Sequence, residues 1–179
     1  MTRKHKYIFV FGLFLAFISW MTAAYYWDKL PSVIPVHFGV DGQPNSWADK
    51  TVFYVFLIPV LQSLMLAGFA FLYDRPQYTN MPSTLWLTTL SKKNREQAFG
   101  LIRSMLTGTL LFISIIFTYI TYMMNAAAMD SSIGLSPFVM IVLVAGMLIW
   151  IGVWTVKVYK VTKQVIKPKT AKKVKRGGK

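Results

Sequence analysis

Cysteine is absent from the 179 residues of this chain, and histidine occurs only twice, as His5 and His37. Without cysteine the protein has no disulfide, no thiolate metal ligand and no cysteine nucleophile. Two histidines are too few for a multi-histidine metal centre, because zinc sites usually draw on three or four protein ligands. No serine stands at a recognisable spacing from a base. The sequence therefore predicts no catalytic residue, no metal site and no cofactor.

Acidic residues are also scarce, with 6 Asp and Glu against 20 Lys and Arg, which gives a formal net charge of +14. In a soluble protein this excess would suggest a nucleic-acid partner. Here no base-reading or base-stacking module accompanies the basic residues. We therefore expect no nucleic-acid partner, and the position of the charges along the chain becomes more informative than their sum.

Long apolar runs dominate the chain, in which 55% of the residues are hydrophobic. Four of these runs reach about 20 residues, the length at which a helix spans the hydrocarbon layer of a bilayer. The sequence therefore predicts an all-α integral membrane protein with four transmembrane helices. The predicted helices occupy residues 7–27, 52–73, 100–124 and 137–158.

The first apolar run has a second interpretation, as a cleaved signal peptide. Thr22, Ala23 and Ala24 are small enough to serve as a cleavage site. The apolar core of a signal peptide is usually about 7–15 residues long, and this run is longer. An uncleaved first helix is therefore the preferred interpretation.

Lysine and arginine are concentrated on one side of the predicted helices. Residues 1–6 carry 3 basic residues, residues 74–99 with Arg103 carry 5, and residues 159–179 with Lys157 carry 10. The first connection, residues 28–51, carries 2, and the third connection, residues 125–136, carries none. Cytoplasmic segments of membrane proteins carry the excess of basic residues, so both termini are predicted to face the cytoplasm. The basic tail also suits anionic lipid. The predicted cytoplasmic segments are residues 1–6, 74–99 and 159–179, and the predicted outer segments are residues 28–51 and 125–136.

A few polar residues interrupt or border the apolar runs. Gln62 and Ser63 follow Pro59 by one turn, and polar groups at that depth prefer to face protein, so we expect them to join helices. Arg103 lies one turn inside the third run and is expected to reach back to the head groups as an interface anchor. Ser91 is expected to cap the helix that leads into the third run.

The first outer segment has the pattern of a hairpin. Its prolines favour extended backbone, and apolar residues then alternate with His37 and Gly39 in the period of two that is typical of a strand. Asp41 and Gly42 follow, the strongest short-range signal for a tight hairpin turn. The sequence predicts a short structured hairpin at the outer face. The candidate ligand-binding residues are Leu30, Pro31, Pro35, His37, Asp41, Gly42, Pro44 and Lys50.

Two interpretations of the polar hairpin residues stay open. In one, His37 and Asp41 meet across the turn and bind or act on a ligand. In the other, His37 forms a hydrogen bond within the loop and Lys50 anchors the start of the second helix. The second connection supplies a separate set of candidates for contact with a cytoplasmic partner, namely Arg75, Pro76, Asn80, Pro82 and Asn94.

The order L-P-x-x-I-P-x-H-x-x-x-x-G-x-P-x-x-x-x-x-K over residues 30–50 resembles the signature of a bacterial domain of unknown function, number 1648. That domain is found in short multi-pass membrane proteins and in SdpI-like immunity proteins, and the second connection also resembles the family. The resemblance implies a four-helix protein of the bacterial plasma membrane. In SdpI-like members it implies immunity against a secreted, membrane-active peptide, sometimes with signalling to a cytoplasmic repressor.

Three functions are compatible with these patterns. The first is immunity or sensing, in which the outer hairpin meets a peptide toxin or another envelope ligand. The second is an accessory membrane subunit of a transporter or envelope complex, assembled through the helices, because charges near the middle of the membrane are scarce. The third is an enzyme at the membrane surface that acts through His37 and Asp41.

Overall fold

The computed structural model describes residues 1–79 and 90–166 of the chain. In this part of the chain, long helices and one antiparallel β-hairpin follow one another, with the hairpin between the first two helices, which confirms the predicted fold class. The elements are α1 (Arg3–Tyr26), β1 (Val33–Phe38), β2 (Pro44–Asp49), α2 (Val52–Asp74), η1 (Pro76–Tyr78), α3 (Lys92–Met129) and α4 (Pro137–Ile166).

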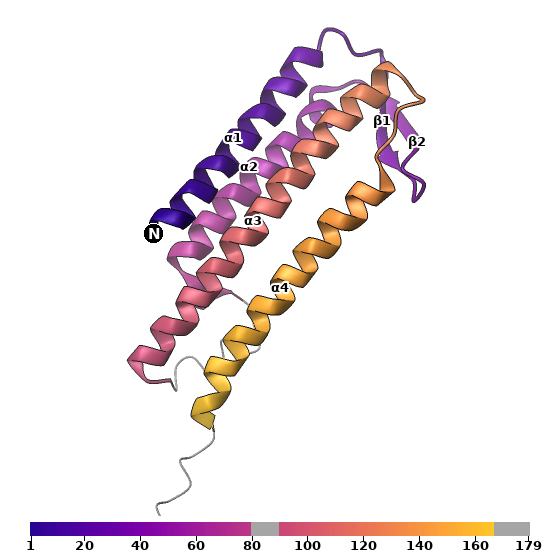
Figure 1. Cartoon of the computed structure of the whole chain (residues 1–179). Helices are drawn as coiled ribbons and strands as arrows, with labels where there is room; N and C mark the ends of the chain where they lie inside the picture. The colour runs from indigo at the N-terminus through magenta and orange to yellow at the C-terminus, as the bar shows by residue number, and fades with distance from the viewer. Residues whose placement is uncertain (80–89, 167–179) are drawn as a thin grey trace, which may run out of the picture.

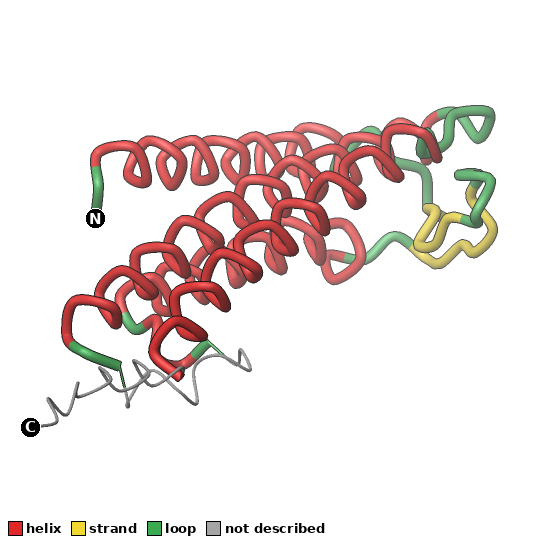
Figure 2. Tube along the Cα trace, turned by 60° about the horizontal axis from the view of Figure 1, so that its bottom comes forward, coloured by secondary structure: helices red, strands yellow, loops and turns green. Residues whose placement is uncertain are grey.

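Helix α3 is the central helix of the bundle. Helices α1, α2 and α4 each pack against it, and α1 also packs against α2 (Figure 1). The hairpin lies at the end of the bundle where α1 ends and α2 begins (Figure 2). This end is called the hairpin end below. The opposite end contains the first turn of α1 and the last turn of α2.

Within residues 1–79 and 90–166, four helices are long and apolar enough to cross a membrane. Large apolar side chains such as Phe17, Leu64 and Leu148 are more than half exposed on their outer faces. A soluble protein rarely exposes apolar surface on this scale. Such surface is favourable against hydrocarbon, so the chain is a multi-pass membrane protein.

Local residues explain where these helices begin. The side-chain oxygens of Thr2, Thr51 and Ser91 accept hydrogen bonds from backbone N–H groups in the first turns of α1, α2 and α3. The cap at Ser91 is as the sequence predicts. Helix α3 then continues for 38 residues. At about 1.5 Å per residue it is longer than the hydrocarbon layer is thick, so it extends beyond the bilayer.

A polar group joins three helices in the middle of the bundle. Gln62 of α2 is completely buried. Its Oε1 accepts from Ser19 Oγ of α1 at 2.7 Å, and its Nε2 donates to Ser114 O and Thr118 Oγ1 of α3, each at 3.2 Å. Ser63 accepts from the indole Nε1 of Trp20 at 3.0 Å. Both residues therefore join helices, as predicted.

Helix α4 is held on α3 by a close contact between a glycine and a tryptophan. A Cβ atom on Gly108 would lie 2.2 Å from the ring of Trp150, so only glycine leaves room for this indole. The ring nitrogen of Trp150 donates to Met105 O at 3.1 Å. Trp150 therefore joins α4 to α3.

Candidate ligand-binding hairpin

The strands β1 and β2 are joined by a short loop whose last residue must be glycine. Gly39 N donates to Gln43 O at 2.8 Å, and Gly42 N donates to Gly39 O at 2.9 Å. Gly42 has a φ of 80°, the left-handed conformation that such three-residue hairpin loops require after their turn. Asp41 accepts from Gln43 N at 3.0 Å and stabilises the loop. The predicted hairpin and its Asp-Gly turn are confirmed.

The tip of the hairpin is fixed to the connection between α3 and α4. Leu135 N donates to Gly42 O at 2.8 Å. The approach is so close that a Cβ on Gly42 would lie 1.8 Å from Leu135 O, and one on Gly134 would lie 2.4 Å from Gly42 O. The connection is itself ordered by Ser132, whose hydroxyl and N–H both donate to Asp130 and hold the pKa of that carboxyl below its usual range. The hairpin, which belongs to the connection between α1 and α2, therefore also rests on the connection between α3 and α4.

The base of the hairpin is held by a small apolar cluster. Leu30, Ile34, Ala23 and Val55 are buried together, and they come from the loop, β1, α1 and α2. Pro35 is also buried on β1. Burial of these residues explains why leucine, isoleucine and proline stand at these positions. Two other motif prolines are less enclosed, since Pro31 is exposed and Pro44 half-buried.

Lys50 connects the end of β2 to the end of α1. Its Nζ donates to Trp27 O at 3.2 Å and to Leu30 O at 3.1 Å, and it lies 5.3 Å from the ring centroid of Trp27. Carbonyl groups at the C-terminal end of a helix carry partial negative charge, which favours an ammonium group there. Thr51, the next residue, caps α2. The interpretation of Lys50 as an anchor at the start of the second helix fits this geometry.

His37 is the exposed polar residue of the motif. Its Nδ1 donates to Asn45 Oδ1 on β2 at 2.6 Å, whereas Asp41 accepts from the backbone of the loop. The structure thus does not pair His37 with Asp41. A histidine held by an amide lacks the carboxylate that would orient and activate it as a base. The hydrogen bond within the hairpin fits the second interpretation of His37, in which this residue has a local structural role.

Metal ligands are not assembled here. Among residues 1–79 and 90–166, no three His, Asp or Glu side chains could together hold a metal ion.

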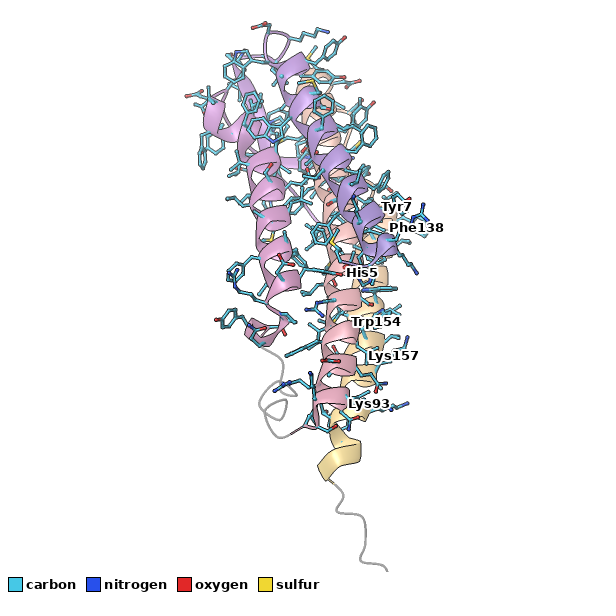
Figure 3. All side chains as sticks on the ribbon, turned by 90° about the vertical axis from the view of Figure 1, so that its left-hand side faces the viewer. His5, Tyr7, Lys93, Phe138, Trp154 and Lys157 are labelled. Carbon is cyan, nitrogen blue, oxygen red and sulfur yellow. The ribbon has the colours of Figure 1, made fainter. Side chains whose placement is uncertain are left out.

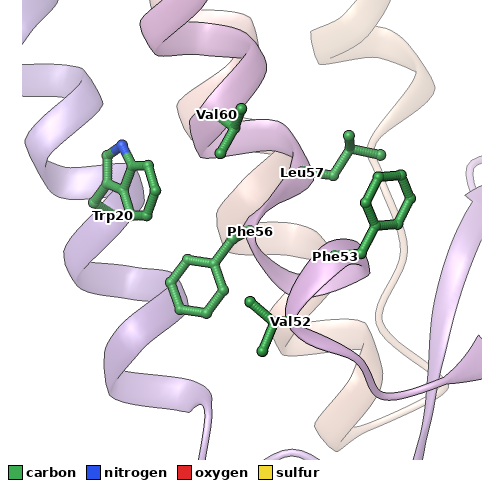
Figure 4. Close-up of a pocket in the computed structure, with 6 residues that line it drawn as sticks. All are labelled: Trp20, Val52, Phe53, Phe56, Leu57 and Val60. Atoms are coloured by element: carbon green, nitrogen blue, oxygen red, sulfur yellow. The ribbon is translucent and has the colours of Figure 1, made fainter.

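An apolar groove of about 390 Å³ lies between α1 and α2 near the hairpin end (Figure 4). It is lined by apolar side chains including Trp20, Phe53 and Phe56, so it supplies no charge to the hairpin.

The candidate residues of the second connection are only partly described. Pro76 is buried at the start of η1, and the guanidinium carbon of Arg75 lies 4.7 Å from the ring centroid of Phe71. The N–H of Asn94 donates to the capping Ser91 Oγ at 3.4 Å. These contacts give the three residues local structural roles. Asn80 and Pro82 lie outside the described residues.

A second polar cluster, at the opposite end, was not recognised in the sequence. His5 on α1 contacts Tyr73 Oη at 3.0 Å and Ser104 Oγ at 3.2 Å, and Arg103 Nε donates to Tyr73 O at 3.0 Å. The partners are 68 and 99 residues from His5, so no local spacing connects them. The available signals were a histidine in the first turn of one helix and an arginine inside the apolar run of another.

Comparisons with known proteins bear on the hairpin most directly. A family model described as Domain of unknown function (DUF1648) matches residues 14–62. The matched residues comprise the half of α1 nearer to the hairpin, the hairpin itself and the first half of α2. No curated protein and no solved structure matches the chain. The resemblance of the hairpin motif to this family is thereby confirmed over residues 14–62.

Proposed function

We propose that the chain is a plasma-membrane protein of a bacterium that senses, or confers immunity against, a peptide or another envelope ligand that binds at the hairpin. The observation that carries this proposal is a hairpin fixed at its base and its tip that still presents one strand to solvent. A rigid, exposed strand loses little conformational freedom on binding, which favours affinity. The SdpI-like part of the family resemblance points to the same function.

The exposed strand is β2. Asn45, Ser46 and Trp47 are all exposed, whereas β1 packs against α3 (Figure 1). The outer edge of a sheet carries backbone N–H and C=O groups that an extended peptide can pair with. His37 and Asn45 add a polar pair beside this edge, and Trp47 adds an aromatic surface. Together they suit a peptide with both polar and apolar side chains.

The charge distribution supports an outer location for the hairpin. The two segments predicted to lie outside carry 2 basic residues, and the rest of the chain carries 18. By the positive-inside rule the hairpin faces outward, where a secreted peptide would arrive. The second connection and the basic tail then face the cytoplasm, where a partner protein or anionic lipid could bind.

The proposal is tested by expressing the full chain in a sensitive bacterium and adding membrane-active peptides. Membrane depolarisation is the readout, at matched protein abundance. We expect the wild type to protect the cells and Trp47→Ala and His37→Ala to protect them at least tenfold less well. Phe138→Ala is the matched control, because Phe138 is an exposed aromatic residue at the same end but outside the hairpin.

Protection that is equally strong in both hairpin variants would remove the hairpin as the ligand site. Protection that falls equally in Phe138→Ala would indicate a general effect on the membrane. If the wild type gives no protection against any peptide, immunity is the wrong function for this chain.

A further inference from the structure

A cavity of about 550 Å³ lies at the end of the bundle opposite to the hairpin. It is surrounded by the start of α1, the end of α2 and the third and fourth turns of α3. Its lining combines polar and apolar side chains, and the polar ones come from all three helices. The residues that matter here are Thr2, His5, Tyr73, Asp74, Arg103 and Ser104.

The wall of this cavity is fixed by hydrogen bonds. Tyr73 is buried, and its hydroxyl contacts both His5 Nδ1 at 3.0 Å and Thr2 N at 3.3 Å. The other nitrogen of His5 contacts Ser104 Oγ. Arg103 uses Nε to reach Tyr73 O at 3.0 Å, which occupies one of the five N–H donors of its guanidinium group. Arg103 is therefore positioned while most of its donors are left for other partners.

The charges around the cavity are poorly compensated. The first turn of α1 contains Arg3, Lys4 and Lys6 and no acidic residue. A helix N-terminus carries partial positive charge and favours anions, so these cations stand at the unfavourable end of the helix. Arg103 adds a further positive charge. Among the described residues that line the cavity, Asp74 is the one carboxylate. An anion in the cavity would relieve this excess.

A second, apolar cavity of about 180 Å³ shares His5 and Ser104 with the first. It lies between α1, α3 and α4 and is lined by Lys4 and by apolar residues such as Phe112 and Trp154. Figure 3 labels His5 and Trp154, both in the half of the bundle away from the hairpin. An anion site that continues into an apolar cavity matches an amphiphile with a charged head group and a hydrocarbon chain.

We propose that these two cavities form a binding site for an anionic phospholipid. The phosphate lies against Arg103 in the first cavity, and an acyl chain occupies the apolar cavity beside Lys4 and Trp154. A guanidinium group matches the geometry of phosphate oxygens and binds them through two parallel hydrogen bonds. His5, Tyr73 and Ser104 are positioning residues that hold Arg103 and the cavity wall in place. This site contains no residue of the hairpin.

The test uses the full chain purified in mild detergent with equal amounts of phosphatidylglycerol and phosphatidylcholine of identical acyl chains. Native mass spectrometry measures which lipid stays bound. We expect preferential retention of phosphatidylglycerol, with the preference reduced about tenfold in Arg103→Gln. Arg95→Gln makes the same change of charge at an exposed position of the same helix and should leave the preference unchanged. Asp74→Asn removes the opposing carboxylate and should raise it.

An equal fall in Arg95→Gln would show that only the general surface charge matters and would overturn the site. Displacement of the lipid by inorganic phosphate or by glycerophosphoglycerol at equal concentration would overturn the role of the acyl chain. If Arg103→Gln lowers the yield of folded protein, Arg103→Lys serves in its place. It keeps the charge but loses the paired donors, and a preference as strong as that of the wild type would contradict the proposed phosphate contact.

Discussion

At the scale of single residues, Lys50 joins the end of β2 to the end of α1. Its ammonium group holds two carbonyl groups beyond α1, at Trp27 and Leu30. Lys50→Met keeps the apolar stem and removes these hydrogen bonds. We expect a loss of about 1–3 kcal/mol in the free energy of unfolding, since a buried acceptor left without its charged donor costs that much. Hydrogen exchange of residues 33–49, followed by mass spectrometry, should become faster.

Lys29→Met is the control for this variant. Lys29 is exposed at the same end and lies 3.2 Å from the ring centroid of Tyr25. Exposed contacts of this kind contribute little to stability. If exchange in the hairpin accelerates equally in both variants, Lys50 is not the anchor inferred from its two hydrogen bonds.

Gly42 combines two requirements in one residue. Its φ of 80° disfavours any residue with a Cβ, and that Cβ would also collide with Leu135 O. We expect Gly42→Ala to cost about 1–3 kcal/mol and to release the hairpin from residues 130–136. Faster hydrogen exchange at Leu135 is the measurement. Gly68→Ala, where a Cβ would meet nothing within 4 Å, should leave exchange unchanged, and an equally mild effect at Gly42 would contradict the docked tip.

The sequence predicted which hairpin residues have structural roles in the backbone better than it predicted the hydrogen-bond partners of their side chains. Proline, glycine and lysine positions followed from backbone rules that act over a few residues. The partner of His37 did not, because it depends on irregularities in strand pairing between Pro35 and His37 and between His37 and Phe38. These place His37 opposite Ser46 and bring its ring to Asn45. Strand register of this kind is decided by tertiary contacts.

At the scale of the helices, Gln62 is the clearest case of a polar residue that joins elements. It connects α2 to Ser19 of α1 and to Ser114 and Thr118 of α3. Gln62→Ala would leave buried partners without their hydrogen bonds. We expect a loss of about 1–2 kcal/mol, the upper range found for such bonds in membrane proteins, measured as a lower midpoint of denaturation in mixed detergent micelles.

Leu64→Ala provides the comparison for Gln62, since Leu64 faces outward from the same helix and is 62% exposed. Truncating this side chain removes mostly surface that faces away from the bundle. The midpoint should stay near that of the wild type. A larger effect at Leu64 than at Gln62 would mean that α2 is held by its outer surface, contrary to the packing described above.

Which helices pack together was less predictable than where they lie in the sequence. In a membrane both the lipid-facing and the protein-facing sides of a helix are apolar, so hydropathy does not distinguish them. The contact of Trp150 with Gly108 joins residues that are far apart in the chain, so no local pattern predicts it. The joining role of Gln62 was predictable because a buried amide needs a partner.

At the scale of the whole molecule, two polar sites lie at opposite ends of one bundle. The hairpin end carries Asp28, Asp41, Asp49 and Asp130, four of the six acidic residues, whereas the opposite end carries the basic cluster around Arg103. Four long apolar runs and this charge asymmetry were readable from the sequence. The contact between the hairpin and the 130–136 connection could not be predicted from the sequence. It joins two loops that α2 and α3 separate along the chain.

This asymmetry predicts an orientation of the bundle in the membrane that a direct experiment can test. Because the chain has no cysteine, single cysteines report one position each. Val40, at the tip of the hairpin, is fully exposed, and Lys93 is exposed at the start of α3. By the positive-inside rule we expect Val40→Cys to react with a membrane-impermeant maleimide in intact cells and Lys93→Cys to react only after permeabilisation. Leu148→Cys, on the apolar face of α4, should react in neither condition, because the reactive thiolate does not form in hydrocarbon. The reverse pattern at Val40 and Lys93 would place the hairpin in the cytoplasm and would remove a secreted peptide as its ligand.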